Sequence, residues 1–119
     1  MNRRYRLTNP NDFKRVRRTG KSYAHPLIVL VASNNGLLFS RFGFSAGRSI
    51  GNAVHRNRAK RRLRHLLREI HEQISPGWDL VLIARKGCLR AEWPEMKQAL
   101  MDLIQRADLL MHTENENVH

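Results

Sequence analysis

The sequence predicts a single α+β domain in which helices pack on one four-stranded sheet. The chain has 119 residues, enough for one hydrophobic core. Its apolar residues recur at helical spacing in some segments and at strand spacing in others, in the order α-β-β-β-α-β-α. No internal repeat or low-complexity linker divides these segments. We therefore expect residues 1–111 to form one α+β sandwich and the polar residues 112–119 to form a disordered tail.

The first helix is expected to begin within residues 8–12 and to end at Thr19-Gly20. A threonine or asparagine before Pro10 accepts hydrogen bonds from the free amides of the first turn, and proline fits the first helical position. Phe13 and Val16 share the apolar face of this helix. From the sequence alone, Phe13 suits either core packing or stacking on a ligand.

Three strands are predicted next. Residues 22–32 form an extended apolar run that Pro26 interrupts, which indicates a short strand followed by a longer one. Turn residues at 33–36 then lead into an alternating strand at 37–46. Because the connection is short and rich in turn residues, we expect the strands on either side of it to pair as a hairpin.

The remaining elements are a long basic helix, a buried strand and a last amphipathic helix. The long helix is expected at residues 54–73, and Ser75-Pro76-Gly77 ends it. Residues 79–85 (DLVLIAR) read as a short buried strand. The last helix begins at Trp93-Pro94, and its apolar stripe extends to Met111.

The charge of the chain is strongly positive and unevenly distributed. There are 22 Lys and Arg residues against 10 Asp and Glu, a net charge of +12. Residues 1–68 hold 17 of the cations and one acidic residue, Asp12. Such a balance favours a nucleic acid or an anionic surface as partner over an ordinary small-molecule substrate. We expect the basic half of the chain to carry the contact surface.

The long helix holds the densest run of this positive charge. It places seven Lys or Arg residues among the thirteen from Arg56 to Arg68, with no Asp or Glu. Its apolar residues keep helical spacing and predict a buried stripe of Ala59, Leu63, Leu66, Leu67, Ile70 and Ile74. Like charges at i, i+3 and i+4 repel by a few tenths of a kcal/mol each, so a polyanion is expected to neutralise the opposite face. Arginine binds phosphate bidentately and stacks on bases, which favours folded RNA, although composition alone leaves DNA open.

Other features limit where the protein acts. The single cysteine, Cys88, excludes an internal disulfide and suits a reducing cytoplasm. The N-terminus has no apolar run of the secretory type, and no stretch approaches the roughly 20 apolar residues of a membrane span. We expect a cytoplasmic protein without a membrane partner.

Candidate catalytic and metal-binding groups do not assemble in the sequence. Six histidines are scattered along the chain, and no Cys/His set has zinc-ligand spacing. The segment from Gly43 to Ser49 is only a weak echo of a phosphate-binding loop, because it is one residue short and has Arg in place of Lys. We expect no catalytic residue, no metal ligand and no cofactor bound by the protein alone.

Residues 51–64, GNAVHRNRAKRRLR, resemble the Arg-Asn-Arg signature of the bacterial ribonuclease P protein subunit. RLTNPNDFKRV near the start, RFGFSAGRSIGNAV before the signature and the later DLVLIARKG fall in the same order as in that family. The resemblance covers almost the whole chain. It implies a left-handed β-α-β crossover around the signature helix, whereas right-handed crossovers are the general rule.

The resemblance also implies a function. In that family a large RNA subunit carries out magnesium-dependent removal of the 5′ leader from precursor transfer RNA, and the small protein assists. The family's partners are therefore the catalytic RNA and the leader, with no DNA expected, and Mg²⁺ belongs to the RNA-containing holoenzyme. Residues implied to contact the catalytic RNA are Arg48, Asn52, Arg56, Asn57, Arg58, Lys60, Arg61, Arg62, Arg64 and Arg68.

The leader is implied to bind in a cleft between the first helix and one sheet face. Phe13, Arg17 and Val31 occupy the corresponding positions, so stacking becomes the favoured role of Phe13. Arg17 and Val31 stand where aromatic residues occur in the family. We therefore expect leader binding here to rely less on stacking and more on phosphate contacts.

Two other classes of protein fit parts of the pattern. A ribosomal-type structural RNA-binding protein would be equally basic and similarly folded, and co-purification with ribosomes would identify it. A basic nuclease acting alone is disfavoured, because the sequence lacks a catalytic constellation.

Overall fold

A computed structural model of the chain describes residues 3–111, so the predicted tail at 112–119 lies outside the described residues. The helices are α1 (Pro10–Thr19), α2 (Ala53–Ile70) and α3 (Trp93–Arg106). The strands are β1 (Lys21–Ala24), β2 (Ile28–Asn34), β3 (Arg41–Ala46) and β4 (Trp78–Ala84). Short 3-10 turns are η1 (Arg3–Tyr5), η2 (Arg48–Ile50), η3 (His71–Gln73) and η4 (Lys86–Leu89). This order confirms the predicted α-β-β-β-α-β-α sequence of elements.

The four strands form one mixed sheet in the order β1-β2-β4-β3. β1 and β2 pair antiparallel around the interruption at Pro26, and β2 pairs antiparallel with β4. β3 pairs with β4 in parallel. The predicted hairpin between residues 22–32 and 37–46 is therefore wrong, because β4 lies between those two strands.

The apolar character of β4 explains its place in the sheet. Residues 79–82 and 84 of this strand are buried, so both of its faces need cover and a central position satisfies that need. The connection from β2 to β3 crosses the start of β4. Asn35 ties it there, since its amide nitrogen donates to the carbonyl of Gly77 at 2.9 Å and its side chain donates to Asp79 at 2.9 Å. Local turn chemistry does not reveal this long-range pairing.

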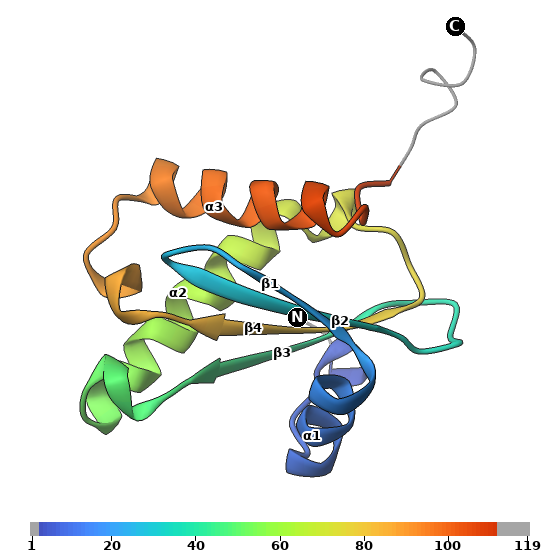
Figure 1. Ribbon diagram of the computed structural model, residues 1–119, viewed down its shortest axis with the longest axis horizontal. Helices are drawn as coiled ribbons and strands as arrows, with labels where there is room; N and C mark the ends of the chain where they lie inside the picture. Colours follow the sequence, from blue (N-terminus) through green and yellow to red (C-terminus); the bar gives the residue numbers. More distant parts are fainter. Residues whose placement is uncertain (1–2, 112–119) are drawn as a thin grey trace, which may run out of the picture.

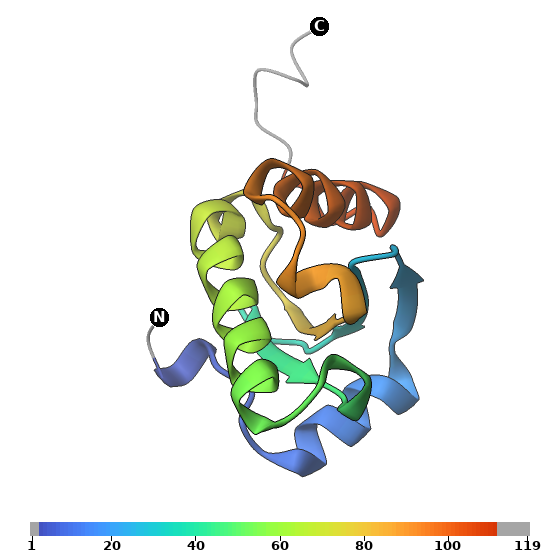
Figure 2. The same ribbon diagram turned by 90° about the vertical axis from the view of Figure 1, so that its left-hand side faces the viewer.

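The helices cover the two faces of the sheet unequally (Figure 1). α2 and α3 lie on one face, where the main core includes Leu30, Leu82, Leu66 and Leu100. α1 lies on the other face over a smaller core formed by Leu7, Val16, Val31 and Val81. Seen end-on in Figure 2, the sheet separates α1 from α2 and α3.

The connection from β3 through α2 to β4 is a crossover between parallel neighbours. Viewed from the α2 side with both strands pointing up, β4 lies to the left of β3 (Figures 1 and 2). The crossover is therefore left-handed, as the family resemblance implied. It leaves the outer side of α2 uncovered along the edge of the molecule in Figure 2.

Helix ends follow the predicted chemistry closely. Asn9 caps α1 by accepting from the amide of Asn11 at 2.9 Å, with Pro10 in the first turn. Asn52 caps α2 by accepting from the amide of His55 at 3.0 Å. α2 ends at Ile70 and continues as η3 to Gln73, so the predicted boundary at 73 covers both elements.

Candidate nucleic-acid interface

The outer face of α2 is a cationic surface built on a buried stripe. Ala59, Leu63, Leu66, Leu67 and Ile70 are buried against the sheet. With 100° between successive residues, that stripe turns other side chains outward. Exposed on this outer face are Asn57, Arg58, Arg61, His65 and Arg68. Within the part of the chain that the structure describes, Arg58, Arg61 and Arg68 form no ion pair with a carboxylate.

The start of α2 brings further predicted residues to the same end. Arg48 and Asn52 are exposed on the approach to the helix, and Asn52 is also its N-cap. Arg56 donates to the carbonyl of Gly51 at 3.0 Å, which fixes its side chain across the approach loop. The exposed amide of Asn57 follows on the outer face. These groups present donors where the positive end of the helix dipole also favours an anion.

Arg62 has a different role from its neighbours. Its guanidinium donates to the carbonyls of Cys88, Leu89 and Ala91 at 2.8, 2.9 and 2.7 Å. It also lies 5.8 Å from the centre of the Trp93 ring. Three carbonyl acceptors occupy most of its donors, so the structure places Arg62 as a brace between α2 and the η4–α3 connection. Arg62 also lines a cavity with Arg58, Arg61 and His65, and its role as an RNA contact stays a prediction.

Arg64 and Lys60 line the inner edge of α2, where it approaches β3 and the N-terminal segment. The Arg64 guanidinium lies 5.7 Å from the Phe44 ring centre, and its Nε is buried without a hydrogen-bond partner among the described residues. Burial, together with the nearby charges of Arg6 and Arg61, lowers the pKa of Arg64. Arg6, Phe44, Arg64 and Arg68 line a cavity of about 260 Å³. We call these four residues the arginine cavity.

Neither Arg6 nor Phe44 is among the RNA contacts predicted from the sequence. Two signals were present: Arg6 follows the basic segment at residues 3–4, and Phe44 belongs to the alternating strand. Neither signal shows that the N-terminal segment lies beside β3. That placement depends on the hydrogen bond from the amide of Leu7 to the carbonyl of Phe42, at 2.7 Å.

Phe13 lies on the sheet face that α1 covers. Its ring occupies the space above Gly43, where an added Cβ would collide with the ring. Phe13 also lines a small cavity of about 190 Å³ together with Lys60 and Arg64. The half-buried ring therefore borders the cationic edge of α2 and remains partly open to a ligand.

The other two predicted leader residues differ in exposure. Arg17 is exposed on α1 and free to meet a phosphate. Val31 is only 2% exposed, because α1 covers it together with Val16 and Val81. A direct contact between Val31 and a leader does not fit this packing. The neighbouring Val29 and Ile83 are half-buried on the same face and extend it outward.

A buried carboxylate that the sequence analysis missed holds α1 in place. Asp79 is fully buried and accepts hydrogen bonds from Arg15 at 2.6 Å, from Arg41 at 2.9 and 2.7 Å, and from Asn35 at 2.9 Å. Burial alone would raise the pKa of Asp79, but the hydrogen bonds from Arg41, Asn35 and Arg15 outweigh it and hold the pKa below its usual value. An acidic residue at the head of an apolar strand was the available signal.

A second missed group lies where α2 meets α3. The indole nitrogen of Trp93 donates to both carboxylate oxygens of Glu69 at 3.3 Å, and Lys97 pairs with Glu69 at 2.9 Å. The hydrogen bond from Lys97 lowers the pKa of Glu69. Glu69 and Trp93 border a cavity of about 450 Å³ that Arg58, Arg61 and His65 also line. The carboxylate is already paired, so this group mainly fixes α3 against the basic helix.

Among residues 3–111, no group of three or more His, Cys, Asp or Glu side chains is placed to hold a metal ion. No helix in that range is long and apolar enough to cross a membrane. The single thiol, Cys88, is buried, and burial raises its pKa.

Known proteins share both the sequence and the fold. Residues 1–108 match the family described as Ribonuclease P. The chain is similar to the ribonuclease P protein component of Herpetosiphon aurantiacus, with 42% identity over 109 residues that cover 92% of this chain and 89% of that protein.

Two solved structures are similar across most of the chain. The RNase P protein from Thermotoga maritima has a TM-score of 0.76 and 31% identity, covering 85% of this chain and 96% of that one. A Staphylococcus aureus RNase P protein mutant with defective mRNA degradation activity has a TM-score of 0.80 and 28% identity, covering 90% and 91%. With a family match over residues 1–108, the chain belongs to the ribonuclease P protein family.

Proposed function

We propose that this chain binds the catalytic RNA subunit of ribonuclease P through the outer face of α2 and contacts the 5′ leader of precursor transfer RNA through the α1 side of the sheet. As a ribonuclease P component it serves transfer RNA 5′ processing together with an RNA subunit. In this proposal each RNA has its own surface on the protein. The protein would act in the cytoplasm, where a single buried thiol is stable.

The unpaired cations of α2 carry this proposal. Arg58, Arg61 and Arg68 project from a helix whose other side is buried, so the backbone that carries them is in place before RNA arrives. Their guanidinium groups can each bind phosphate oxygens bidentately. Each neutralised phosphate releases counterions, so the affinity should fall steeply as salt increases.

The proposed contribution to the reaction is electrostatic and positional. Two RNAs repel each other where precursor and catalytic RNA meet, and a cationic protein between them reduces that repulsion. Phe13 and Arg17 would hold the leader, which fixes the substrate relative to the RNA active centre. The magnesium-dependent hydrolysis is assigned to the RNA, because the described residues offer neither a nucleophile–base pair nor a set of metal ligands.

The test is a comparison of precursor cleavage with and without the RNA subunit. The purified protein alone should leave precursor transfer RNA intact, whereas adding it to a bacterial ribonuclease P RNA should stimulate cleavage at low magnesium. Metal-dependent cleavage at the leader junction by the protein alone would overturn the assignment. One of the similar Staphylococcus aureus proteins is a mutant with defective mRNA degradation activity. An mRNA should therefore be tested as a second substrate for the protein alone.

A further inference from the structure

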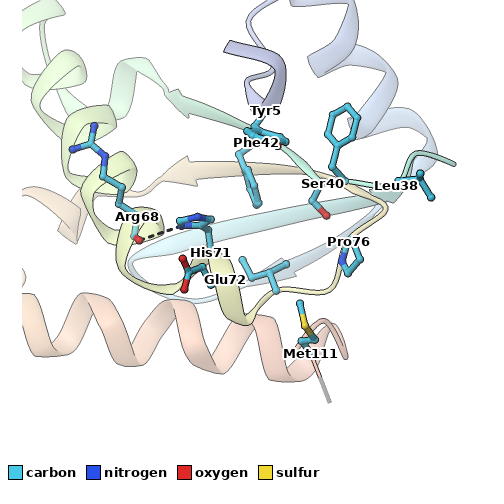
Figure 3. Close-up of a pocket in the computed structure, with 11 residues that line it drawn as sticks. Tyr5, Leu38, Ser40, Phe42, Arg68, His71, Glu72, Pro76 and Met111 are labelled. Atoms are coloured by element: carbon cyan, nitrogen blue, oxygen red, sulfur yellow. Dashed lines mark hydrogen bonds between the residues drawn. The ribbon is translucent and has the colours of Figure 1, made fainter. Parts of the chain in front are cut away.

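An apolar pocket of the described chain lies at the far end of α2 from the signature, on the other side of β3 from α1. Tyr5, Phe39 and Phe42 form its aromatic wall, and Arg68, His71 and Glu72 border it from the α2 side (Figure 3). Its volume is about 410 Å³, within the usual range of small-ligand pockets. None of the predicted contacts except Arg68 lines it.

We propose that this pocket binds an unpaired nucleobase of an RNA, while the adjoining arginine cavity holds the phosphate of the same nucleotide. The inference rests on the proposed RNA-binding function and extends it from Arg64 and Arg68 to an apolar pocket whose other lining residues lie outside the family signature. Only Arg68 belongs to both cavities, so base and phosphate would meet on either side of one guanidinium.

The wall of the pocket suits a flat aromatic ligand. The rings of Tyr5 and Phe39 pack edge to face, with centroids 5.4 Å apart and an interplanar angle of 78°. The guanidinium of Arg4 lies 4.8 Å from the Phe39 ring centre, and this cation–π contact stabilises the position of the ring. Leu38, 96% exposed, and Met111, 47% exposed, border the opening with apolar surface that no described residue covers. Bases stack on aromatic side chains such as Tyr5 and Phe39 regardless of sequence.

Polar groups at the α2 side suit the edge of a base. Nδ1 of His71 forms a hydrogen bond with the carbonyl of Arg68 at 3.1 Å. Nε2, on the other side of the ring, takes no part in that bond. Glu72 is exposed beside it and supplies carboxylate acceptors. The hydroxyl of Ser40 is not available, because it already bonds the carbonyl of Ser75 at 2.9 Å and the amide of Trp78 at 3.1 Å.

Charge favours a nucleotide over a lipid or an apolar peptide. Within the described residues, Arg6, Arg64 and Arg68 have no carboxylate partner, and Nε of Arg64 is buried without an acceptor. A phosphate in the arginine cavity would neutralise this clustered charge by accepting hydrogen bonds from the guanidinium groups that line it. An apolar ligand would leave the charge without a counter-charge.

Adenosine 5′-monophosphate and ribose 5-phosphate are matched probes, because they share the phosphate and differ in the base. Both should be titrated into the ¹⁵N-labelled full chain while amide shifts are followed. Adenosine 5′-monophosphate should shift amides around residues 38–42 and 68–72 and bind more tightly. Ribose 5-phosphate should shift mainly those near Arg6 and Arg64. Equal affinities with the same shifted amides, or shifts by the nucleotide confined to the surroundings of Phe13, would overturn the proposal.

Variants then isolate the aromatic wall. Tyr5→Ala should weaken nucleotide binding about fivefold or more and leave ribose 5-phosphate unchanged. Phe39→Leu keeps an apolar side chain for folding and should show the same selective loss. Tyr23→Ala is the control, because Tyr23 is a half-buried tyrosine on β1 that does not line the pocket. A Phe39→Leu chain that folds and still binds the nucleotide normally would contradict the assignment.

Holoenzyme measurements identify which RNA supplies the base. If Phe39→Leu weakens binding of ribonuclease P RNA itself, the base belongs to the catalytic RNA. If it weakens only precursors with a long leader, the base belongs to the leader. Unchanged affinity for both RNAs would reject the site. If the protein stimulates cleavage by ribonuclease P RNA but no nucleotide binds in the pocket, this inference alone is wrong. If the protein does not stimulate cleavage, the proposed function is wrong.

Discussion

The fully buried carboxylate of Asp79, at the start of β4, accepts a 2.6 Å hydrogen bond from the guanidinium of Arg15 on α1. Arg41 binds the same carboxylate from β3, so one side chain links α1 to two strands. Arg15 lies between Phe13 and Arg17 along α1. The orientation of the proposed leader-binding helix on the sheet therefore depends on this carboxylate.

Replacing Asp79 with Asn should destabilise the fold markedly. The amide keeps the size of the side chain but leaves Arg41 without its counter-charge and Arg15 with only the weaker pair to Asp12 at 3.4 Å. The free energy of unfolding should fall by about 2–4 kcal/mol, measured by urea denaturation. Asp102→Asn is the control, because its pair with Arg106 is exposed at 3.6 Å and should contribute less than about 0.5 kcal/mol. Equal losses in the two variants would argue against the buried network.

The same carboxylate predicts a pH dependence. The hydrogen bonds that outweigh burial lower the pKa of Asp79 in the folded state, so the folded protein binds fewer protons than the unfolded chain. This contribution to stability is complete above the unfolded pKa of about 3.9 and is lost as the pH falls through the folded value. The difference in unfolding free energy between wild type and Asp79→Asn should be constant from pH 5 to 7 and shrink below about pH 4. A difference that grows in acid would contradict this sign.

Local patterns predicted the elements but not all their partners. Asn9, Pro10 and Asn52 identified helix starts because capping is a contact between near neighbours in the sequence. The order β1-β2-β4-β3 depends on contacts between distant segments. A hairpin was the simplest reading of the turn after β2, and only the burial of β4 on both faces shows why that strand separates β2 from β3.

In the candidate site, too, local spacing predicts some features, whereas others depend on contacts between distant segments. Helical spacing correctly identified the buried stripe of α2 and hence its exposed side. Spacing places Arg62 near the edge of that face but cannot show the three carbonyls that occupy it. Likewise, the burial of Val31 depends on where α1 packs, which no pattern within β2 reveals.

Arg61 and Arg62 are sequence neighbours that should behave differently. Arg61→Ala removes an exposed cation without an ion-pair partner among the described residues, so it should weaken binding to ribonuclease P RNA and lower the salt slope by roughly 0.7–0.9. Its unfolding free energy should stay within about 0.5 kcal/mol of wild type. Filter binding at several salt concentrations and urea denaturation measure the two quantities.

Arg62→Ala should show the opposite pattern. Removing its guanidinium leaves the carbonyls of Cys88, Leu89 and Ala91 without this donor, at a cost of about 1–3 kcal/mol in stability. At a temperature where the variant is folded, its salt slope for RNA should match that of wild type. A stable Arg62→Ala protein with a reduced slope would instead support Arg62 as an RNA contact.

Phe13 and Gly43 should prove to be one functional unit, because the ring of Phe13 occupies the space that a methyl group on Gly43 would need. Phe13→Ala removes the ring and Gly43→Ala displaces it. Both should weaken binding of precursor transfer RNA by the holoenzyme, about fivefold or more if one base stacks there, with little change for mature transfer RNA. Gly47→Ala is the matched control, since an added Cβ there meets nothing within 4 Å. Equal weakening for precursor and mature transfer RNA would separate Phe13 from the leader and leave it as a packing residue under α1.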